Sequence, residues 1–354
     1  MQTHLPERNL DVVRAIAVLC VVGDHALRVS LPGPQSETGL LGTLGTFGVL
    51  LFFVHTALVL MRSLERQGER RDWMRAFYFR RAFRVYPLAI VAVLLVVAIG
   101  DPQAGHALPR GEAGPFTSPD AATIASNLAL VQNLTAKRSI LGPLWTLPIE
   151  LQMYLLLPLC FLAARRTWRA MLVLFAAFGA AYLMVAHPII PGTGRLTVFA
   201  YGPCFLAGVV AYHLLRRGAE PKRSVLILAP VLIAAAAYLY FALRQPHRSL
   251  TWLTPMAVGI ALPHIREAAA SPLTRLAHII CRYSYGIYLL HVPVLWFAAT
   301  KLESYPVLFR NAVAIAGIAG LPWIAYHLVE KPGINLGKRL VRGPASDAAF
   351  APAP

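Results

Sequence analysis

Long apolar runs, separated by short polar segments, dominate the chain up to about residue 328. A helix needs about 20 mainly apolar residues to cross the hydrocarbon core of a bilayer. Ten runs approach that length, so the pattern predicts an all-α polytopic membrane protein, a bundle of about ten transmembrane helices. The expected spans are residues 10–29, 40–61, 85–100, 145–164, 170–187, 197–215, 224–243, 249–265, 283–300 and 307–328.

Composition supports a membrane protein. The chain is 57% hydrophobic and 14% charged, whereas soluble domains average about 25% charged residues. The net charge of +17 comes from basic residues that lie between the apolar runs. This placement favours anionic lipid at the cytoplasmic leaflet and an anionic cytoplasmic substrate over nucleic acid as partners. The four cysteines form no CxxC pair, so neither a disulfide framework nor a metal site is expected.

The basic residues also predict the orientation of the chain. With the N-terminus inside, the inner segments hold most of the 33 Lys and Arg residues, and basic residues concentrate on the cytoplasmic side of membrane proteins. Both termini are therefore expected to be cytoplasmic. We expect residues 1–340 to form one integral-membrane domain and residues 341–354 to form a disordered cytoplasmic tail.

The longest outer segment, residues 101–144, begins rich in Pro and Gly and then becomes amphipathic over "AATIASNLALVQNL". Ile124, Leu128 and Val131 recur there at spacings of four and three. That spacing predicts a helix with one apolar face. We expect it to lie against the bundle or on the membrane surface.

The first span, "LDVVRAIAVLCVVGDHALRV", carries four polar side chains, and a charge at the bilayer centre costs about 2.5–3.5 kcal/mol on insertion scales. At 100° per residue, Arg14 and His25 differ by only about 20° around the helix and share a face. Asp11 lies one turn before Arg14, which predicts an ion pair between them. Asp24 points away from this face and has no assigned role. A snorkelling Arg14 and a packed His25 are the structural alternative.

A second intramembrane charge, Glu150, lies in "LWTLPIELQMYLLLPL", with Trp145 beside it as an interfacial anchor. Glu150 falls about 7 Å inside the outer face, close to the depth inferred for His25. A carboxylate beside an imidazole can orient it, as in an acid–base pair. The sequence therefore predicts a contact between Glu150 and His25, and the alternative is a structural Glu at a helix start.

An arginine cluster, Arg80, Arg81 and Arg84, lies in "FYFRRAFRVYPL" at the cytoplasmic start of a span. Topology signalling explains part of any such cluster. The functional alternative is phosphate binding, because the guanidinium fork suits pyrophosphate oxygens.

A polar stripe runs along the later segment "CRYSYGIYLLHVPVLWF". Ser284, Tyr288 and His291 lie at spacings of four and three, on one face of an otherwise apolar helix. Such a stripe can bond helices to one another, or it can serve a reaction directly. The pattern alone leaves both interpretations open.

These segments together resemble the acyltransferase family 3 membrane proteins, which include O-acyltransferases of O-antigen, exopolysaccharide, Nod-factor and macrolide acceptors. The resemblance rests on "LDVVRAIAVLCVVGDH", "FGVLLFFVHTALVL", "FRRAFRVYP", "LWTLPIELQMYLLLPL", "YGPCFLAGVVAY", "SYGIYLLHVPV" and "HLVEKP", in this order from about residue 8 to 340.

The resemblance implies that an acyl group moves from cytoplasmic acyl-CoA to a hydroxyl of a glycan or lipid-linked glycan. The group is expected to be acetyl, from acetyl-CoA, and a bulkier group such as succinyl stays open. By motif position, His25 and Glu150 correspond to the catalytic residues. The residues that correspond to the CoA-binding set are Arg14, Arg80, Arg81 and Arg84.

We further expect the substrates to contact a set of polar and aromatic side chains, namely Trp145, Tyr154, Ser284, Tyr288 and His291. Two segments depart from the family pattern. His55, Thr56 and Ala57 follow Val54 where the family often has Ser-Gly. Thr146, Pro148 and Leu151 surround Glu150, which leaves a single acidic residue there.

Two other functions stay open. Intramembrane Arg, His and Glu could form the proton relay of a transporter or exporter. A scaffold subunit with degenerate motifs is the other alternative, although the chain retains Arg14, His25 and Glu150. The expected location is the bacterial inner membrane, and the sequence carries no signal of an oligomeric state.

Overall fold

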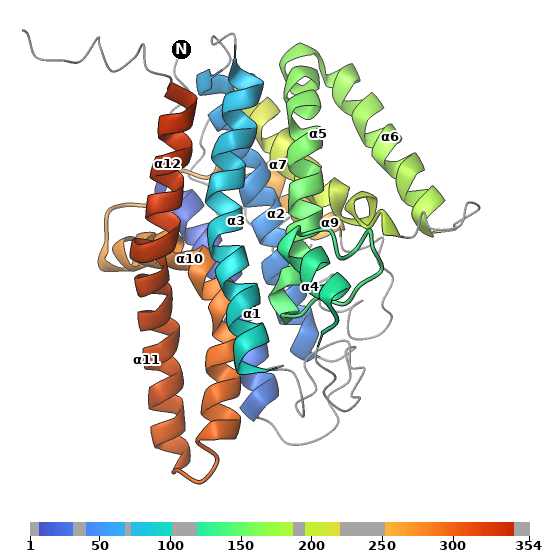
Figure 1. Cartoon of the computed structure of the whole chain (residues 1–354). Helices are drawn as coiled ribbons and strands as arrows, with labels where there is room; N and C mark the ends of the chain where they lie inside the picture. Colours follow the sequence, from blue (N-terminus) through green and yellow to red (C-terminus); the bar gives the residue numbers. More distant parts are fainter. Residues whose placement is uncertain are drawn as a thin grey trace, which may run out of the picture.

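The computed structural model of the chain describes residues 7–30, 40–67, 72–100, 119–186, 195–219 and 252–342. Within these ranges every regular element is a helix, which confirms the all-α prediction. The α-helices are α1 (Glu7–Ser30), α2 (Leu40–Gln67), α3 (Trp73–Ile99), α4 (Ala121–Leu128), α5 (Thr146–Arg166), α6 (Trp168–Ala186), α7 (Val198–Arg216), α9 (Leu253–Ala261), α10 (Pro272–Trp296), α11 (Val307–Ala325) and α12 (Lys331–Arg342). Figure 1 shows most of the long helices packed side by side, with α11 and α12 forming one line.

Six helical stretches of the described chain are long and apolar enough to cross a membrane: Thr43–Gln67, Trp73–Ile99, Gly142–Arg166, Trp168–Val185, Val198–Arg216 and Val307–Val341. Helices α1 and α10 have comparable lengths, 24 and 25 residues, and both carry polar side chains within otherwise apolar sequence. The protein is therefore a multi-pass membrane protein, as the apolar runs predict.

Several helices extend beyond the expected spans. Helix α3 begins at Trp73 rather than at 85, and α10 begins at Pro272 rather than at 283. The apolar pattern ends at the basic residues, whereas a helix does not, because Arg and Lys are good helix formers. The start of α10 is fixed by a capping box between Ser271 and Thr274.

Some of the expected segments are described only in part, and others lie outside the described residues. The span at 249–265 appears in the described part as the nine-residue helix α9, followed by the short 3₁₀ turn Leu262–His264. The span at 224–243, most of the Pro- and Gly-rich segment and nearly all of the expected tail lie outside the described residues.

Helix α2 is at the centre of the bundle, where it contacts α1, α5, α7 and α9. Two glycines allow its closest approaches. A Cβ on Gly48 would meet the carbonyl oxygen of Ala17 in α1, and a Cβ on Gly208 of α7 would meet the carbonyl oxygen of Val54. Small residues at such crossings let helix backbones approach closely.

Helices α1 and α10 also pack against each other, although they lie at opposite ends of the sequence. They run in the same direction, because contacts occur in the same order along both helices. Arg14 contacts Ser284, and eleven residues later His25 contacts His291. This orientation agrees with the predicted topology, in which both helices leave the cytoplasmic side.

The amphipathic segment after the Pro- and Gly-rich stretch was expected to lie either against the bundle or on the membrane surface, and it lies against the bundle. Helix α4 contacts α3, and Ile124 and Leu128 pack against the main hydrophobic core. The hydroxyl of Tyr86 in α3 donates to the carbonyl of Ala129 at 3.1 Å. The helix is shorter than the predicted stretch, since it ends at Leu128.

Candidate functional site

The polar face of α1 points at α10. The guanidinium Nε of Arg14 donates to Ser284 Oγ at 2.5 Å. Further along, His25 Nδ1 and His291 Nε2 are 2.7 Å apart. The two rings meet edge to edge and are nearly coplanar, with centroids 5.0 Å apart and 15° between their planes. The prediction that Arg14 and His25 share one face is thus confirmed, and this face meets the polar stripe of α10.

The predicted ion pair between Asp11 and Arg14 is wrong. Asp11 Oδ2 lies 2.7 Å from His278 Nδ1, and Arg14 extends over the ring of Phe52, with 5.7 Å from Cζ to the centroid. The spacing of Asp11 and Arg14 does allow a pair, but α10 supplies a separate partner for each of them.

Asp24, which had no predicted role, pairs with Arg28 one turn later. The Oδ2–Nε distance is 2.9 Å, and both side chains are almost fully buried. Asp24 also faces α2, because a Cβ on Gly45 would come within 2.9 Å of its carboxylate. The pair leaves no net charge buried at this level of α1.

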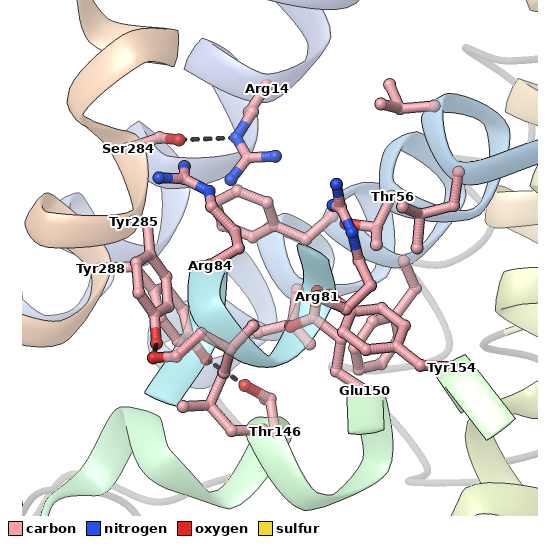
Figure 2. A pocket seen from close by; sticks show the side chains of 17 residues that line it. Arg14, Thr56, Arg81, Arg84, Thr146, Glu150, Tyr154, Ser284, Tyr285 and Tyr288 are labelled. Atoms are coloured by element: carbon pink, nitrogen blue, oxygen red, sulfur yellow. Dashed lines mark hydrogen bonds between the residues drawn. The ribbon is translucent and has the colours of Figure 1, made fainter. Parts of the chain in front are cut away.

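A pocket opens between α1, α2, α3, α5 and α10 (Figure 2). Its volume is about 80 Å³, several times the ~10–15 Å³ that one water requires. Figure 2 shows three arginine side chains towards one side and Thr146 with Glu150 towards the other. The polar and aromatic lining consists of Arg14, Phe52, Phe53, Thr56, Arg81, Arg84, Thr146, Glu150, Tyr154, Ser284, Tyr285 and Tyr288.

The arginine cluster of α3 divides between the pocket and its surroundings. Arg81 and Arg84 line the pocket, and Arg80 does not. Arg84 forms an ion pair with Glu330, whose side chain is fully buried. The ring of Tyr285 lies under the Arg84 guanidinium, 5.5 Å from Cζ. Two of the three arginines of the predicted cluster therefore line the pocket.

The predicted contact between Glu150 and His25 is absent. Glu150 accepts a hydrogen bond from Tyr154, one turn along α5, and it lines the same pocket as Arg14 and Arg81. His25 lies eleven residues, or about 16 Å, along α1 from Arg14. Depth estimates from span ends place Glu150 and His25 together because they ignore the tilt and offset of the helices.

The polar stripe of α10 bridges the two halves of the site. The hydroxyls of Tyr288 and Thr146 are 2.9 Å apart, and the Tyr288 and His291 rings lie 6.4 Å apart between centroids. Tyr154, Ser284 and Tyr288 thus line the pocket, and His291 lies beyond its Tyr288 end. Each residue of the predicted stripe thus contacts a polar side chain of another helix. The partners of Ser284, Tyr288 and His291 are Arg14, Thr146 and His25, in that order.

Trp145 lies outside the pocket lining. Its ring packs against Tyr201 of α7, with centroids 5.4 Å apart. His55, one of the departures from the family pattern, is buried, and its Nδ1 has no hydrogen-bond partner among the described residues. The adjacent Thr56 lines the pocket instead.

Sequence reasoning did not single out Glu330 or Tyr285. Glu330 lies in the quoted segment "HLVEKP" and follows an apolar run. A carboxylate in that position is itself a signal, because intramembrane charges are rare without a partner. Its partner on α3 could not be identified from spacing along the chain.

The comparisons with known proteins that found a match all indicate an acyltransferase. The family model described as an acyltransferase domain matches residues 7–327. Acyltransferase MdmB of Streptomyces mycarofaciens is 25% identical to the chain, over 98% of this chain and 96% of the relative. Peptidoglycan O-acetyltransferase OatA of Listeria monocytogenes is 25% identical over 92% of this chain, which spans about half of that relative, 55% of its length. No solved structure matches the chain significantly.

Proposed function

The chain belongs to the acyltransferase domain family and is a membrane O-acyltransferase, and on that premise we propose its donor, its acceptor and its catalytic residues. The donor is acyl-CoA, most simply acetyl-CoA, taken from the cytoplasmic side. The acceptor is a hydroxyl of a glycan or lipid-linked glycan. The Listeria relative is named for O-acetylation of peptidoglycan, which supports this acceptor class.

The observation that carries the proposal is the basic pocket that leads towards a histidine pair along α1 and α10. Arg14, Arg81 and Arg84 face the pocket, and guanidinium groups bind phosphate oxygens in bidentate fashion. The volume of the pocket suits a part of CoA rather than the whole molecule. We therefore assign the phosphates to the arginine side and the thioester to the side of Tyr288 and the histidines.

The chemical step follows from the position of His25. Its imidazole accepts the proton of the acceptor hydroxyl while that oxygen attacks the thioester carbonyl. The C–S bond then breaks, and the thiolate of CoA takes the proton back from the imidazolium. General-base catalysis of this kind contributes about 10²–10⁴-fold. Transient acylation of His25 is the less favoured route to the same product.

Glu150 takes a different role from the one expected. Since it bonds to Tyr154 and lines the same pocket as the arginines, we assign it to the pocket rather than to the orientation of His25. There it balances the positive charge of the guanidinium groups and holds Tyr154 in place. Arg80 and Trp145, which do not line the pocket, are assigned to its support rather than to ligand contact.

A proton-coupled transporter is the second candidate, because the polar contacts of α1 and α10 line up along the bundle. The two functions differ in one observable. An acyltransferase releases the thiol of CoA, whereas a transporter moves its substrate and leaves the thioester intact.

The test uses the purified protein in liposomes with acetyl-CoA, with and without a glycan acceptor, and follows free thiol. We expect thiol release that depends on the acceptor and falls by about 10²–10⁴-fold in His25→Ala. The variant should insert and unfold like the wild type. Undiminished release in His25→Ala would overturn the catalytic assignment, and substrate movement without thiol release would favour the transporter.

A further inference from the structure

The histidine pair is held from one side by the backbone of α10. His291 is fully buried, and its Nδ1 lies 2.9 Å from the carbonyl oxygen of Ile287, one turn earlier. Its other nitrogen, Nε2, lies 2.7 Å from His25 Nδ1. Each ring nitrogen of His291 therefore has one partner, and the two partners differ in what they can do.

These contacts determine where the protons lie. A carbonyl oxygen only accepts, so His291 Nδ1 must carry the hydrogen that Ile287 accepts. In a neutral imidazole the other nitrogen is then an acceptor, so His291 Nε2 accepts from His25 Nδ1. His25 in turn keeps its lone pair on Nε2. The carbonyl of Ile287 thus determines the tautomer of His291, and His291 in turn determines the tautomer of His25.

We propose that His291 is a positioning residue that holds His25 in the tautomer with a basic Nε2 and orients its ring to accept the proton of the acceptor hydroxyl. This inference rests on the proposed function, in which His25 is the general base. The part that a carboxylate plays in many histidine sites is taken here by a second, neutral histidine.

The hydrogen bond between His25 and His291 persists after His25 has accepted the proton. When Nε2 takes the proton of the hydroxyl, His25 becomes an imidazolium whose Nδ1–H still donates to His291 Nε2. The rings are nearly coplanar, with 15° between their planes, so the Nδ1–H of His25 points along the ring plane at the Nε2 lone pair of His291. No proton has to leave the pair, so the proton stays available on Nε2 for the departing thiolate.

Two substitutions separate positioning from packing. His291→Gln places an acceptor oxygen near the position of Nε2 and an amide donor near the Ile287 carbonyl. His291→Phe retains an aromatic ring that fills the space and removes the acceptor. A packing role predicts that Phe substitutes better than Gln, and a positioning role predicts the reverse.

The experiment measures kcat and the KM for acetyl-CoA in liposomes for both variants. We expect a loss in kcat of about 10–100-fold for His291→Phe, by analogy with the loss on removing a group that orients a metal-binding histidine. The KM should stay unchanged, and His291→Gln should recover most of the kcat. His278→Gln, on the same helix but paired with Asp11, is the matched control and should keep the wild-type kcat.

Equal kcat in the Phe and wild-type proteins, or a Gln variant no better than Phe, would overturn the inference. If the Phe variant does not fold, His291→Asn replaces it, because its shorter side chain withdraws the acceptor and keeps the polarity. Loss of activity in Asn with recovery in Gln supports positioning, and equal activity contradicts it. An active His25→Ala protein would instead overturn the proposed function itself, whatever the His291 variants do.

Discussion

Single residues explain how the bundle tolerates its intramembrane charges, because the charges of α1 have partners. Asp24 pairs with Arg28, and Arg14 bonds to Ser284. Burying a charge is costly unless it is paired and hydrogen-bonded. The sequence could predict which polar residues of α1 share a face, because that depends only on helix geometry. It could not predict Ser284 as a partner, since that residue lies 270 positions away.

The same limit explains the wrong contact predicted for Glu150. Its depth in the membrane follows from counting residues, and the direction in which it points depends on packing between helices. Tyr154, on the same helix and one turn away, was within reach of a spacing argument. The relation of Glu150 to the arginines of α3 became visible only in the fold.

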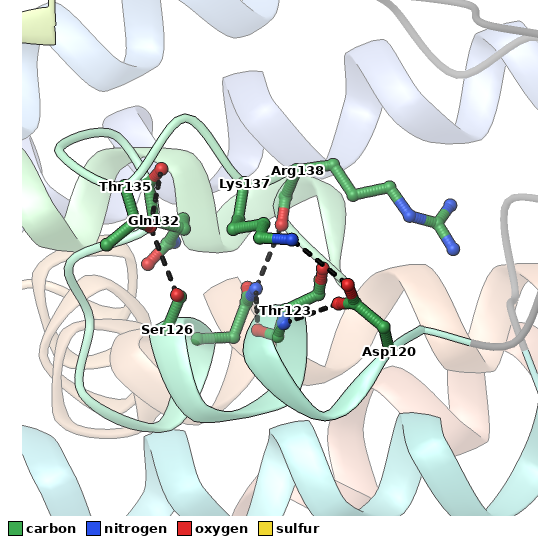
Figure 3. Close-up of polar contacts among 8 residues, drawn as sticks. Asp120, Thr123, Ser126, Gln132, Thr135, Lys137 and Arg138 are labelled. Carbon is green, nitrogen blue, oxygen red and sulfur yellow. Dashed lines mark hydrogen bonds and ion pairs between the residues drawn. The ribbon is translucent and has the colours of Figure 1, made fainter.

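Asp120 allows a prediction outside the membrane spans, at the start of α4 (Figure 3). Its carboxylate accepts from the amide of Thr123 at 2.7 Å and from Lys137 Nζ at 3.0 Å. The hydrogen bonds with Thr123, and then with Lys137, lower the pKa of Asp120 to about 2, below its ordinary value of about 4. A lowered folded-state pKa stabilises the segment at pH values above about 4, and this contribution is lost as the pH falls through about 2.

Hydrogen exchange of the α4 amides, corrected for intrinsic rates, measures this effect. Protection should be constant from about pH 8 to 5 and should fall between about pH 4 and 2. Asp120→Ala should show weak protection throughout, while Asp120→Asn should keep part of it, because Asn also caps helices well. Protection in the wild type that stays constant down to pH 2 would contradict the assignment.

At the scale of helices, the apolar pattern predicted the presence of the helices more accurately than the residues at which they begin and end. Helix α3 begins twelve residues before its expected span, because the arginines continue the helix. The pattern also could not show that α11 and α12 continue through the π-helical turn Tyr326–Glu330. That turn carries Glu330, and the ion pair of Glu330 with Arg84 connects the turn to α3. Interruptions of this kind depend on packing rather than on composition.

Two glycines test whether close approach of helices stabilises the bundle. A Cβ on Gly208 would collide with the backbone of α2, whereas a Cβ on Gly320 of α11 would meet nothing within 4 Å. Gly208→Ala should therefore destabilise the protein by about 1–3 kcal/mol. Gly320→Ala should be neutral or stabilising by up to about 1 kcal/mol, since Ala favours helices. Unfolding in detergent compares the two, and equal stabilities would contradict the packing account.

At the scale of the whole molecule, the fold packs helices from the first third of the sequence against helices from the last third. Helix α1 packs on α10, and α12 packs on α3, where Gly333 and Gly337 lie against Phe83. The end of α12 thus lies near the arginine-rich start of α3, on the side expected to be cytoplasmic (Figure 1). Motif order along the chain predicted several residues of the pocket lining, such as Arg81, Tyr154 and Ser284, but not this arrangement, which depends on contacts between distant segments.

The central claim is that the protein binds acyl-CoA in the pocket lined by Arg14, Arg81 and Arg84 and transfers the acyl group to a glycan. It is tested most directly by giving acetyl-labelled CoA, which does not cross membranes, to sealed vesicles of both orientations that carry the protein. We predict labelled glycan when the cytoplasmic face is outward, and none when that face is enclosed unless the vesicles are opened. Labelling that is equal in both sealed orientations, or absent in both while the protein is folded, would contradict the account.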